Sequence, residues 1–100
     1  MKDSDFVLEV REILNYIAEV IETDDQEGLI DIDLSDGILT IANEDGTYVI
    51  NKQTAVKEIW LSSPISGPYH FIKKDGRWVS RGGDELGNIL TKELKFNFEI

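Results

Sequence analysis

The first quarter of the chain carries apolar residues at helical spacing. The spacing of three and four residues predicts an amphipathic helix that is capped by Ser4 and runs to about Thr23. The residues of its apolar stripe are Phe6, Val10, Leu14, Ile17 and Ile21. Winding this helix at about 100° per residue places Asp5, Glu9, Glu12 and Glu19 on the opposite side.

After Gly28 the apolar positions alternate with polar ones, as in strands. The alternation predicts strands over residues 29–35, 38–42, 47–51, 57–62, 69–73 and 77–80. Asp36-Gly37 and Asp45-Gly46 are expected to form hairpin turns, and Asp75-Gly76 leads into the last strand. Residues 63–68 contain two prolines and predict a looser turn.

Helical spacing returns near the end of the chain. Leu86, Ile89, Leu90 and Leu94 predict a second amphipathic helix capped by Asp84, and residues 95–100 are expected to lie back over the core. A helix, about six strands in antiparallel hairpins and a second helix predict an α+β fold. We expect a two-layer α/β sandwich with both helices packed on one face of the sheet. Residues 1–100 are expected to form a single domain.

The charge is uneven along the chain, which has a net charge of −10. Residues 12–51 carry eleven carboxylates and no Lys or Arg, and eight of these carboxylates fall between Glu19 and Asp36. A net acidic domain repels phosphate backbones and anionic lipid. We therefore expect no nucleic acid or membrane partner, and expect cations and basic protein surfaces instead.

Residue usage argues against most catalytic chemistry. The chain has no cysteine, which excludes disulfides, thiolate metal sites and a Cys nucleophile. His70 is the single histidine, and Ser62 and Ser63 lack the Gly-rich turn of a nucleophile elbow. A Ser-His-Asp site is only a minority alternative.

The carboxylates could form a cation-binding face. Glu19 and Glu22 are one helical turn apart and could share one cation, and Asp31 and Asp33 project from one strand face about 6.6 Å apart. Carboxylates suit Fe²⁺, Fe³⁺, Mn²⁺, Mg²⁺ and Ca²⁺ and choose poorly among them. A site of this kind would be weak and exposed. The alternative is a solvated acidic face that keeps the protein soluble.

A second group of polar residues belongs to the predicted sheet. Alternation places Glu58, Trp60 and Ser62 outward, together with His70 if its two aromatic neighbours face the core. Asn51 and Gln53 border the same surface. Aromatic residues among polar ones are typical of protein-binding patches. The alternative is that neighbouring strands half-cover Trp60 and the exposed ring is only tolerated.

Several motifs together resemble the frataxin family, whose bacterial members are called CyaY. They are Asn51-Lys52-Gln53, Ile59-Trp60-Leu61-Ser62-Ser63-Pro64, Ser66-Gly67-Pro68 and Tyr69-His70-Phe71. The likeness extends to the acidic first helix and the hairpin around Asp36-Gly37, and so covers essentially the whole chain. The Ser-Ser-Pro and Ser-Gly-Pro elements resemble mitochondrial members more than many bacterial ones.

The resemblance implies a role in iron homeostasis and iron–sulfur cluster assembly. Frataxins bind Fe²⁺ and Fe³⁺ weakly and exchangeably on an acidic ridge and dock on the cysteine desulfurase complex, so a desulfurase and the cluster scaffold are the implied partners. Carried over by position, the acidic ridge here is Glu12, Glu19, Glu22, Asp25, Glu27, Asp31 and Asp33. The partner face is Asn51, Gln53, Glu58, Trp60 and His70.

Three positions depart from the family pattern. Glu58 stands where an amide is common, which could change partner preference, and Ala18 and Thr23 replace ridge acids of some bacterial members, which could thin the metal sites. We expect a non-enzymatic iron-binding regulator, monomeric unless iron drives oligomers to form. Residues 1–5 resemble neither a signal nor a transit peptide, so we expect a cytoplasmic protein of bacterial type. The alternatives are a ferroxidase that stores iron and an acidic interaction module without a metal role.

Overall fold

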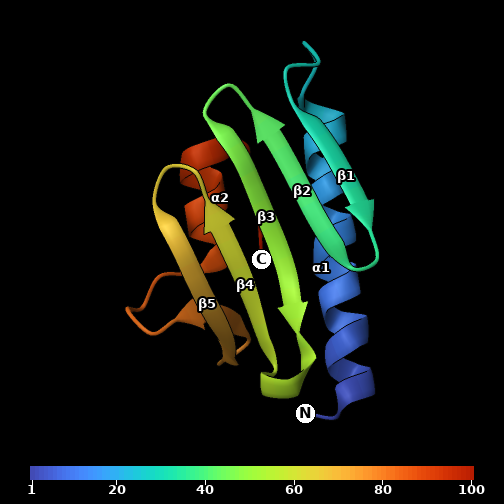
Figure 1. Ribbon diagram of the computed structural model, residues 1–100, viewed down its shortest axis with the longest axis vertical. Helices are drawn as coiled ribbons and strands as arrows, with labels where there is room; N and C mark the ends of the chain where they lie inside the picture. The colour runs from blue at the N-terminus through green and yellow to red at the C-terminus, as the bar shows by residue number, and fades with distance from the viewer.

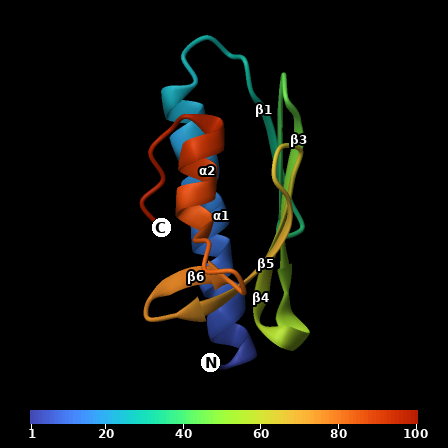
Figure 2. The same cartoon turned by 90° about the vertical axis from the view of Figure 1, so that its left-hand side faces the viewer.

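Residues 1–100, all described by a computed structural model, form a two-layer α/β sandwich. Helices α1 (Asp3–Asp24) and α2 (Leu86–Leu94) cover one face of an antiparallel sheet (Figures 1 and 2). Its strands are β1 (Asp31–Ser35), β2 (Ile38–Asn43), β3 (Gly46–Gln53), β4 (Glu58–Ser63), β5 (Gly67–Lys74) and β6 (Arg77–Ser80). Each strand pairs with its neighbour in sequence, in the order β1-β2-β3-β4-β5-β6, and the 3-10 turn η1 (Thr54–Val56) joins β3 to β4. The predicted fold class is confirmed.

The core lies between the sheet and the two helices. It contains nineteen buried apolar residues, including the whole predicted stripe of each helix. The largest fully buried side chains are Phe6 of α1, Tyr48 of β3 and Phe71 of β5, so both layers contribute to the core. Neither helix has the length and apolar character needed to cross a membrane.

Both predicted helix caps are wrong. Ser4 lies inside α1, whose N-cap is Lys2, and the carbonyl of Lys2 accepts the first helical hydrogen bond from the Phe6 N–H at 2.9 Å. The N-cap of α2 is Glu85. Asp84 is held one residue earlier, because its backbone N–H donates to Ser80 Oγ at 3.0 Å and its carbonyl accepts from the Ser80 N–H at 2.7 Å.

Five of the six strands differ from the prediction by one or two residues at one or both ends, and only β6 has the predicted bounds. β1 begins at Asp31, because the Asp25 carboxylate accepts hydrogen bonds from the N–H groups of Leu29 and Ile30 and so holds these two residues in the loop. The second hairpin turns at residues 44–45, since Asn43 pairs directly with Gly46. The side-chain oxygen of Asn43 accepts from the Asp45 N–H at 2.9 Å, which fixes this turn.

The C-terminal residues fold back over the helical layer, as predicted. Phe98 is buried, and its N–H donates to Thr91 Oγ1 at 3.0 Å. The N–H of Glu99 donates to the Tyr16 hydroxyl at 3.0 Å, which ties the tail to α1. The tail passes so close to α2 that a Cβ at Gly87 would lie 2.6 Å from the Ile100 carbonyl oxygen.

Candidate functional site

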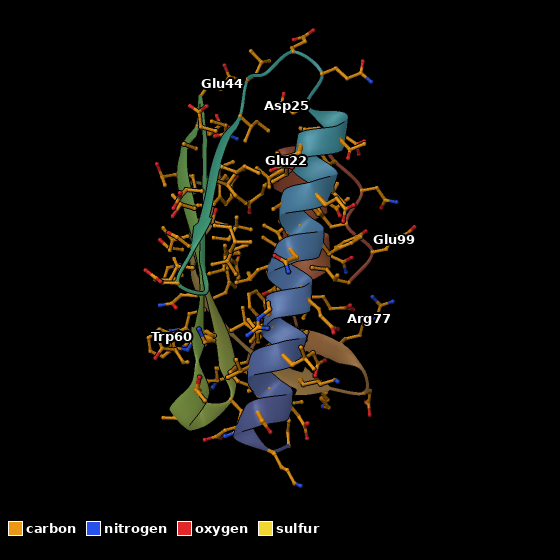
Figure 3. All side chains as sticks on the ribbon, turned by 90° about the vertical axis from the view of Figure 1, so that its right-hand side faces the viewer. Glu22, Asp25, Glu44, Trp60, Arg77 and Glu99 are labelled. Carbon is orange, nitrogen blue, oxygen red and sulfur yellow. The ribbon has the colours of Figure 1, made fainter.

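The residues of the acidic ridge come from α1, β1 and the loop that joins them, which lie at one edge of the molecule (Figure 3). Glu12, Glu19 and Glu22 are exposed on α1. Asp31 and Asp33 are exposed on β1. None of the seven ridge carboxylates forms an ion pair, since the four ion pairs of the structure use Asp3, Glu58, Glu9 and Glu85. The edge is therefore an unneutralised anionic surface.

The ridge is dispersed. Glu12 and Glu19 lie on the side of α1 opposite its buried stripe, whereas Asp31 and Asp33 lie on the face of the sheet away from the helices. No three Asp, Glu or His side chains of the structure come close enough together to hold one metal ion. A cation bound here would have one or two carboxylate ligands, and water would complete its coordination.

Two ridge residues are engaged in local hydrogen bonds, Asp25 in the α1–β1 loop and Asp33 within β1. Both carboxylate oxygens of Asp25 accept backbone hydrogen bonds, at 3.1 Å from Leu29 and at 2.9 Å from Ile30. An acidic residue just after the C-terminus of α1 is unfavourable because it opposes the helix dipole. The two hydrogen bonds that Asp25 accepts explain why an acid is placed there. Asp33 accepts from Ser35 Oγ at 3.0 Å. Asp25 is thus less free to bind a cation than Glu19 or Glu22.

Two further α1 residues differ from their expected places. Glu9 was expected on the outer side of the helix, but it is partly buried and pairs with Lys73 at 2.6 Å. Ala18 is buried in the core at 8% exposure, so its position does not belong to the ridge. An alanine there does not thin the cation sites as the family pattern suggested. Thr23 is exposed at the end of α1.

The partner face is contiguous on the open face of the sheet. Asn51, Trp60 and His70 are directly opposite one another on β3, β4 and β5, and Gln53 pairs with Glu58 in the adjacent row. The Trp60 ring stacks on His70 with centroids 4.0 Å apart and planes at 6°. Trp60 Nε1 donates to Glu58 Oε1 at 2.7 Å, and this oxygen lies 3.8 Å from His70 Nδ1. The structure brings all five predicted residues together.

The outward direction of Trp60 is confirmed. Its strand neighbours Ile59 and Leu61 are buried, whereas Trp60 itself is half-buried and projects from the sheet away from the helices (Figure 3). Phe71 also faces the core, which leaves His70 outward with 54% of its side chain exposed. The stack and the hydrogen bond to Glu58 hold the indole in one orientation. The half-buried indole is therefore rigid, which would lower the conformational-entropy cost of any contact made on this face.

Sequence analysis missed a hydrogen-bonded cluster centred on Glu93 of α2. Its Oε1 accepts from the Tyr48 hydroxyl at 3.1 Å and from Ser63 Oγ at 2.6 Å, and its Oε2 accepts from Ser66 Oγ at 2.6 Å. Burial, and then the hydrogen bond to Glu93, raises the pKa of Tyr48 to about 12. The two serines belong to the Ser-Ser-Pro and Ser-Gly-Pro motifs, but spacing along the chain cannot pair them with a glutamate on a distant helix.

The fold and these two surfaces define a class of protein, a small α/β sandwich with an anionic edge and an aromatic patch on its open sheet face. Residues 1–100 match the family model described as a frataxin-like domain. The chain belongs to the frataxin family.

Relatives and solved structures agree with this assignment. The mitochondrial frataxin homologue of Saccharomyces cerevisiae is 51% identical over 67 residues, which cover 65% of this chain and 38% of that protein. The mitochondrial homologue of Drosophila melanogaster is 40% identical over 89 residues, covering 82% of this chain and 47% of that protein. The chain thus spans less than half the length of these two relatives.

Two solved structures of frataxins share the fold. Frataxin from Psychromonas ingrahamii, of the CyaY family, superposes with a TM-score of 0.76 at 27% identity and covers 99% of this chain and 97% of its own. Trimeric yeast frataxin complexed with ferrous iron superposes with a TM-score of 0.73 at 40% identity. The match covers 95% of this chain and 84% of the yeast chain. The resemblance read from the sequence motifs is confirmed at the level of the family.

Proposed function

We propose that this protein is an iron-binding regulator of iron–sulfur cluster assembly that carries iron weakly on its acidic ridge and docks on a cysteine desulfurase complex. The observation that carries the proposal is the unpaired ridge beside a rigid aromatic patch on a frataxin fold. The ferrous complex of the yeast relative supports iron as the cargo.

The geometry of the ridge supports weak and exchangeable binding. Glu19 and Glu22 are fixed one helical turn apart by α1, and Asp31 and Asp33 are fixed two residues apart by β1. Each pair offers hard oxygen ligands that suit Fe²⁺ and Fe³⁺. Because neither pair is completed by a third protein ligand, water would fill the remaining positions and the ion would exchange readily.

The two surfaces support docking in complementary ways. Unneutralised carboxylates at the α1–β1 edge would attract a basic protein surface and speed its approach. Trp60 is half-buried, oriented by His70 and Glu58, and surrounded by polar side chains. Tryptophan in such a setting is the residue type that most often dominates binding energy.

Our proposal assigns no enzymatic activity to the chain. A ferroxidase would turn over, so O₂ consumption after addition of Fe²⁺ would run well above the rate without protein. We expect the two rates to agree within a factor of about two, which is far below typical enzymatic acceleration. If O₂ consumption is sustained and Glu19→Gln abolishes it, the protein is a ferroxidase and the proposed regulatory function is wrong.

An anaerobic Fe²⁺ titration followed by backbone NMR tests the iron claim. We expect paramagnetic broadening to begin at residues 19–33. Glu19→Gln combined with Glu22→Gln should reduce it there, whereas Asp36→Asn, a change in the β1–β2 turn, should leave it unaltered. Broadening that starts at the β5–β6 turn, where Asp75 is an exposed acid outside the ridge, would refute the assignment.

Binding to a purified cysteine desulfurase tests the partner claim separately. Trp60→Ala should weaken the affinity by roughly thirtyfold, as for a binding hot spot of about 2 kcal/mol. Charge reversal at Glu19 and Glu22 should also weaken the affinity, and the loss relative to the unmodified protein should grow as the salt concentration is lowered. Trp60→Phe, which keeps an aromatic ring against His70, is the matched control and should lose less. Unchanged affinity in both the alanine and the charge-reversal variant would sink the claim.

A further inference from the structure

Lys52 occupies a core-facing position of β3. It continues the inward alternation of Tyr48 and Ile50, and it lies directly opposite Ile59, which is fully buried. Lysine is rarely placed on the inner face of a strand unless it has a partner for its charge. Lys52 is half-buried and forms neither an ion pair nor a side-chain hydrogen bond. The Asn51-Lys52-Gln53 motif therefore contains a cation that the partner face does not use.

Arg11 of α1 is a second unpaired cation beside it. Arg11 and Lys52 are the two basic residues that bound the run without Lys or Arg at residues 12–51. Neither forms an ion pair with any of the eleven carboxylates between them. The fold nevertheless brings both side chains to the same cleft. Two elements thus direct unneutralised positive charge to one place in a protein of net charge −10.

The cleft lies between α1 and the β1–β2 turn. The β1–β2 hairpin turns back beside the middle of α1, and the helix continues well beyond it (Figure 3). The cleft has a volume of about 320 Å³ and is open to solvent. Val7, Val10, Leu14 and Leu34 supply its apolar lining. Asp36 is the single acidic residue that lines it, and Lys52 reaches it past Gly37, where a side chain would collide with the ammonium group.

These features define the chemistry of a ligand. The volume is at the small end of the range of small-molecule sites, about 300–1,000 Å³. An aliphatic chain of a few carbons would cover Val7 and Leu34, the two apolar lining residues that are not fully buried, and a single carboxylate could accept from both the ammonium and the guanidinium group. A dianion would be less favoured, because Asp36 and the net negative charge of the protein oppose it.

We infer that the Arg11–Lys52 cleft binds a short aliphatic monocarboxylate, with the carboxylate between the two cations and the chain against α1. This site is separate from the acidic ridge and from the partner face. Its occupancy does not depend on iron or on a desulfurase.

An NMR titration of the intact protein with sodium hexanoate tests the inference. We expect binding on the order of millimolar, with shifts concentrated at Val7, Leu14 and Leu34. Acetate supplies the carboxylate without the chain, and hexanol the chain without the charge. Each should bind at least about fivefold more weakly than hexanoate, since each loses one of the two contributions.

Variants separate the cations from the rest of the surface. Lys52→Met keeps the aliphatic stem and removes the charge. Arg11→Gln removes the second charge at an exposed position of α1. Each should weaken hexanoate binding by about fivefold. Lys74→Gln is the control, because Lys74 is an exposed lysine without an ion pair on β5. Spectra without ligand would show whether Lys52→Met retains the fold, and Arg11→Gln tests the same charge requirement independently.

Several results would overturn the assignment. If hexanol binds as tightly as hexanoate, the cleft is only an apolar site. If acetate binds as tightly as hexanoate, the cleft attracts anions without recognising the aliphatic chain. Affinity unchanged in both Lys52→Met and Arg11→Gln would remove the cations from the site. If N-acetyl-glycyl-leucine binds more tightly than hexanoate, the ligand of the cleft is a peptide carboxyl terminus and not a free aliphatic acid.

Discussion

Glu93 connects three hydroxyl groups that come from different parts of the sheet. Tyr48 belongs to β3, Ser63 ends β4, and Ser66 lies in the turn before β5. Ser63 Oγ also accepts the N–H groups of Ile65 and Ser66, both at 3.1 Å. One α2 carboxylate therefore fixes the end of the sheet and a turn whose own backbone is arranged around the same serine.

Replacing Glu93 should destabilise the protein. Glu93→Ala leaves the buried Tyr48 and Ser63 hydroxyls without their acceptor, so we expect a loss of about 2–4 kcal/mol in the free energy of unfolding. Glu93→Gln retains an acceptor oxygen and should cost less. Urea denaturation measures both. Lys92→Ala, at the exposed neighbouring position of α2, is the control and should change stability by less than about 0.5 kcal/mol.

Tyr48 predicts a specific loss of stability at alkaline pH. Its pKa is raised from 10.0 to about 12 in the folded protein, so its contribution is fully present below pH 10. This contribution is lost as the pH rises from 10 to 12, by up to about 2–3 kcal/mol. Unfolding free energies at pH 9, 10.5 and 12 measure it. Tyr48→Phe should show a shallower decline, and an equal decline in both proteins would contradict the assignment.

At the scale of elements, α2 and the C-terminal tail form one packed unit. Phe98 is buried and Thr91 accepts its N–H, while Gly87 leaves the space through which residue 100 passes. The tail in turn holds β6, because Arg77 donates to the Ile100 carbonyl oxygen at 2.9 Å. A glycine within a helix costs about 1 kcal/mol relative to alanine, and the close approach of the tail explains why this one is there.

Gly87→Ala should therefore destabilise the protein although alanine favours helices. The added Cβ would meet a backbone oxygen at 2.6 Å, so either the tail or α2 must shift. We expect a net loss of about 1–2 kcal/mol and faster hydrogen exchange at Phe98. Asn88→Ala, at the next and exposed position of α2, should be neutral or slightly stabilising. Stabilisation by Gly87→Ala would show that the tail contact is unimportant.

Hydrophobic spacing predicted the elements well, but it did not predict their ends. The stripe from Phe6 to Ile21 and the alternation around Trp60 follow from periods of 3.6 and 2, which burial imposes along the whole element. The cap at Glu85 and the start of β1 at Asp31 depend on hydrogen bonds made by Ser80 and Asp25, and α1 begins at Lys2 with no side-chain capping bond at all. Such local bonds leave no periodic signal, so Ser4 and Asp84 were wrongly expected to act as caps.

For the molecule as a whole, charge is divided between two regions. Residues 1–50 carry 14 acidic and two basic residues, whereas residues 51–100 carry six acidic and eight basic ones. The sequence predicted the anionic edge, and it predicted that Trp60 and its polar neighbours lie together on the open face of the sheet. It could not predict how far the ridge carboxylates are dispersed, since Glu19 and Asp31 lie in different layers whose separation depends on packing.

Repulsion within the acidic edge should make stability depend on salt. Raising NaCl from about 20 to 300 mM shortens the screening length from roughly 20 to 6 Å. We expect the melting temperature to rise by about 2–6 °C. The double variant Glu19→Gln, Glu22→Gln should be more stable at low salt and respond less. Asp75→Asn, in the basic β5–β6 hairpin, is the control and should retain the full salt response. A fall in melting temperature with salt would contradict this account.

We propose that this protein regulates iron–sulfur cluster assembly through its ridge and partner face. The most direct measurement is the initial rate of cluster formation by a purified cysteine desulfurase and scaffold protein, with and without this chain. We expect a change in rate that saturates with added protein and is lost in Trp60→Ala and in the Glu19 and Glu22 charge reversal. A rate that is unaffected by the protein, or a full effect retained by both variants, would contradict it.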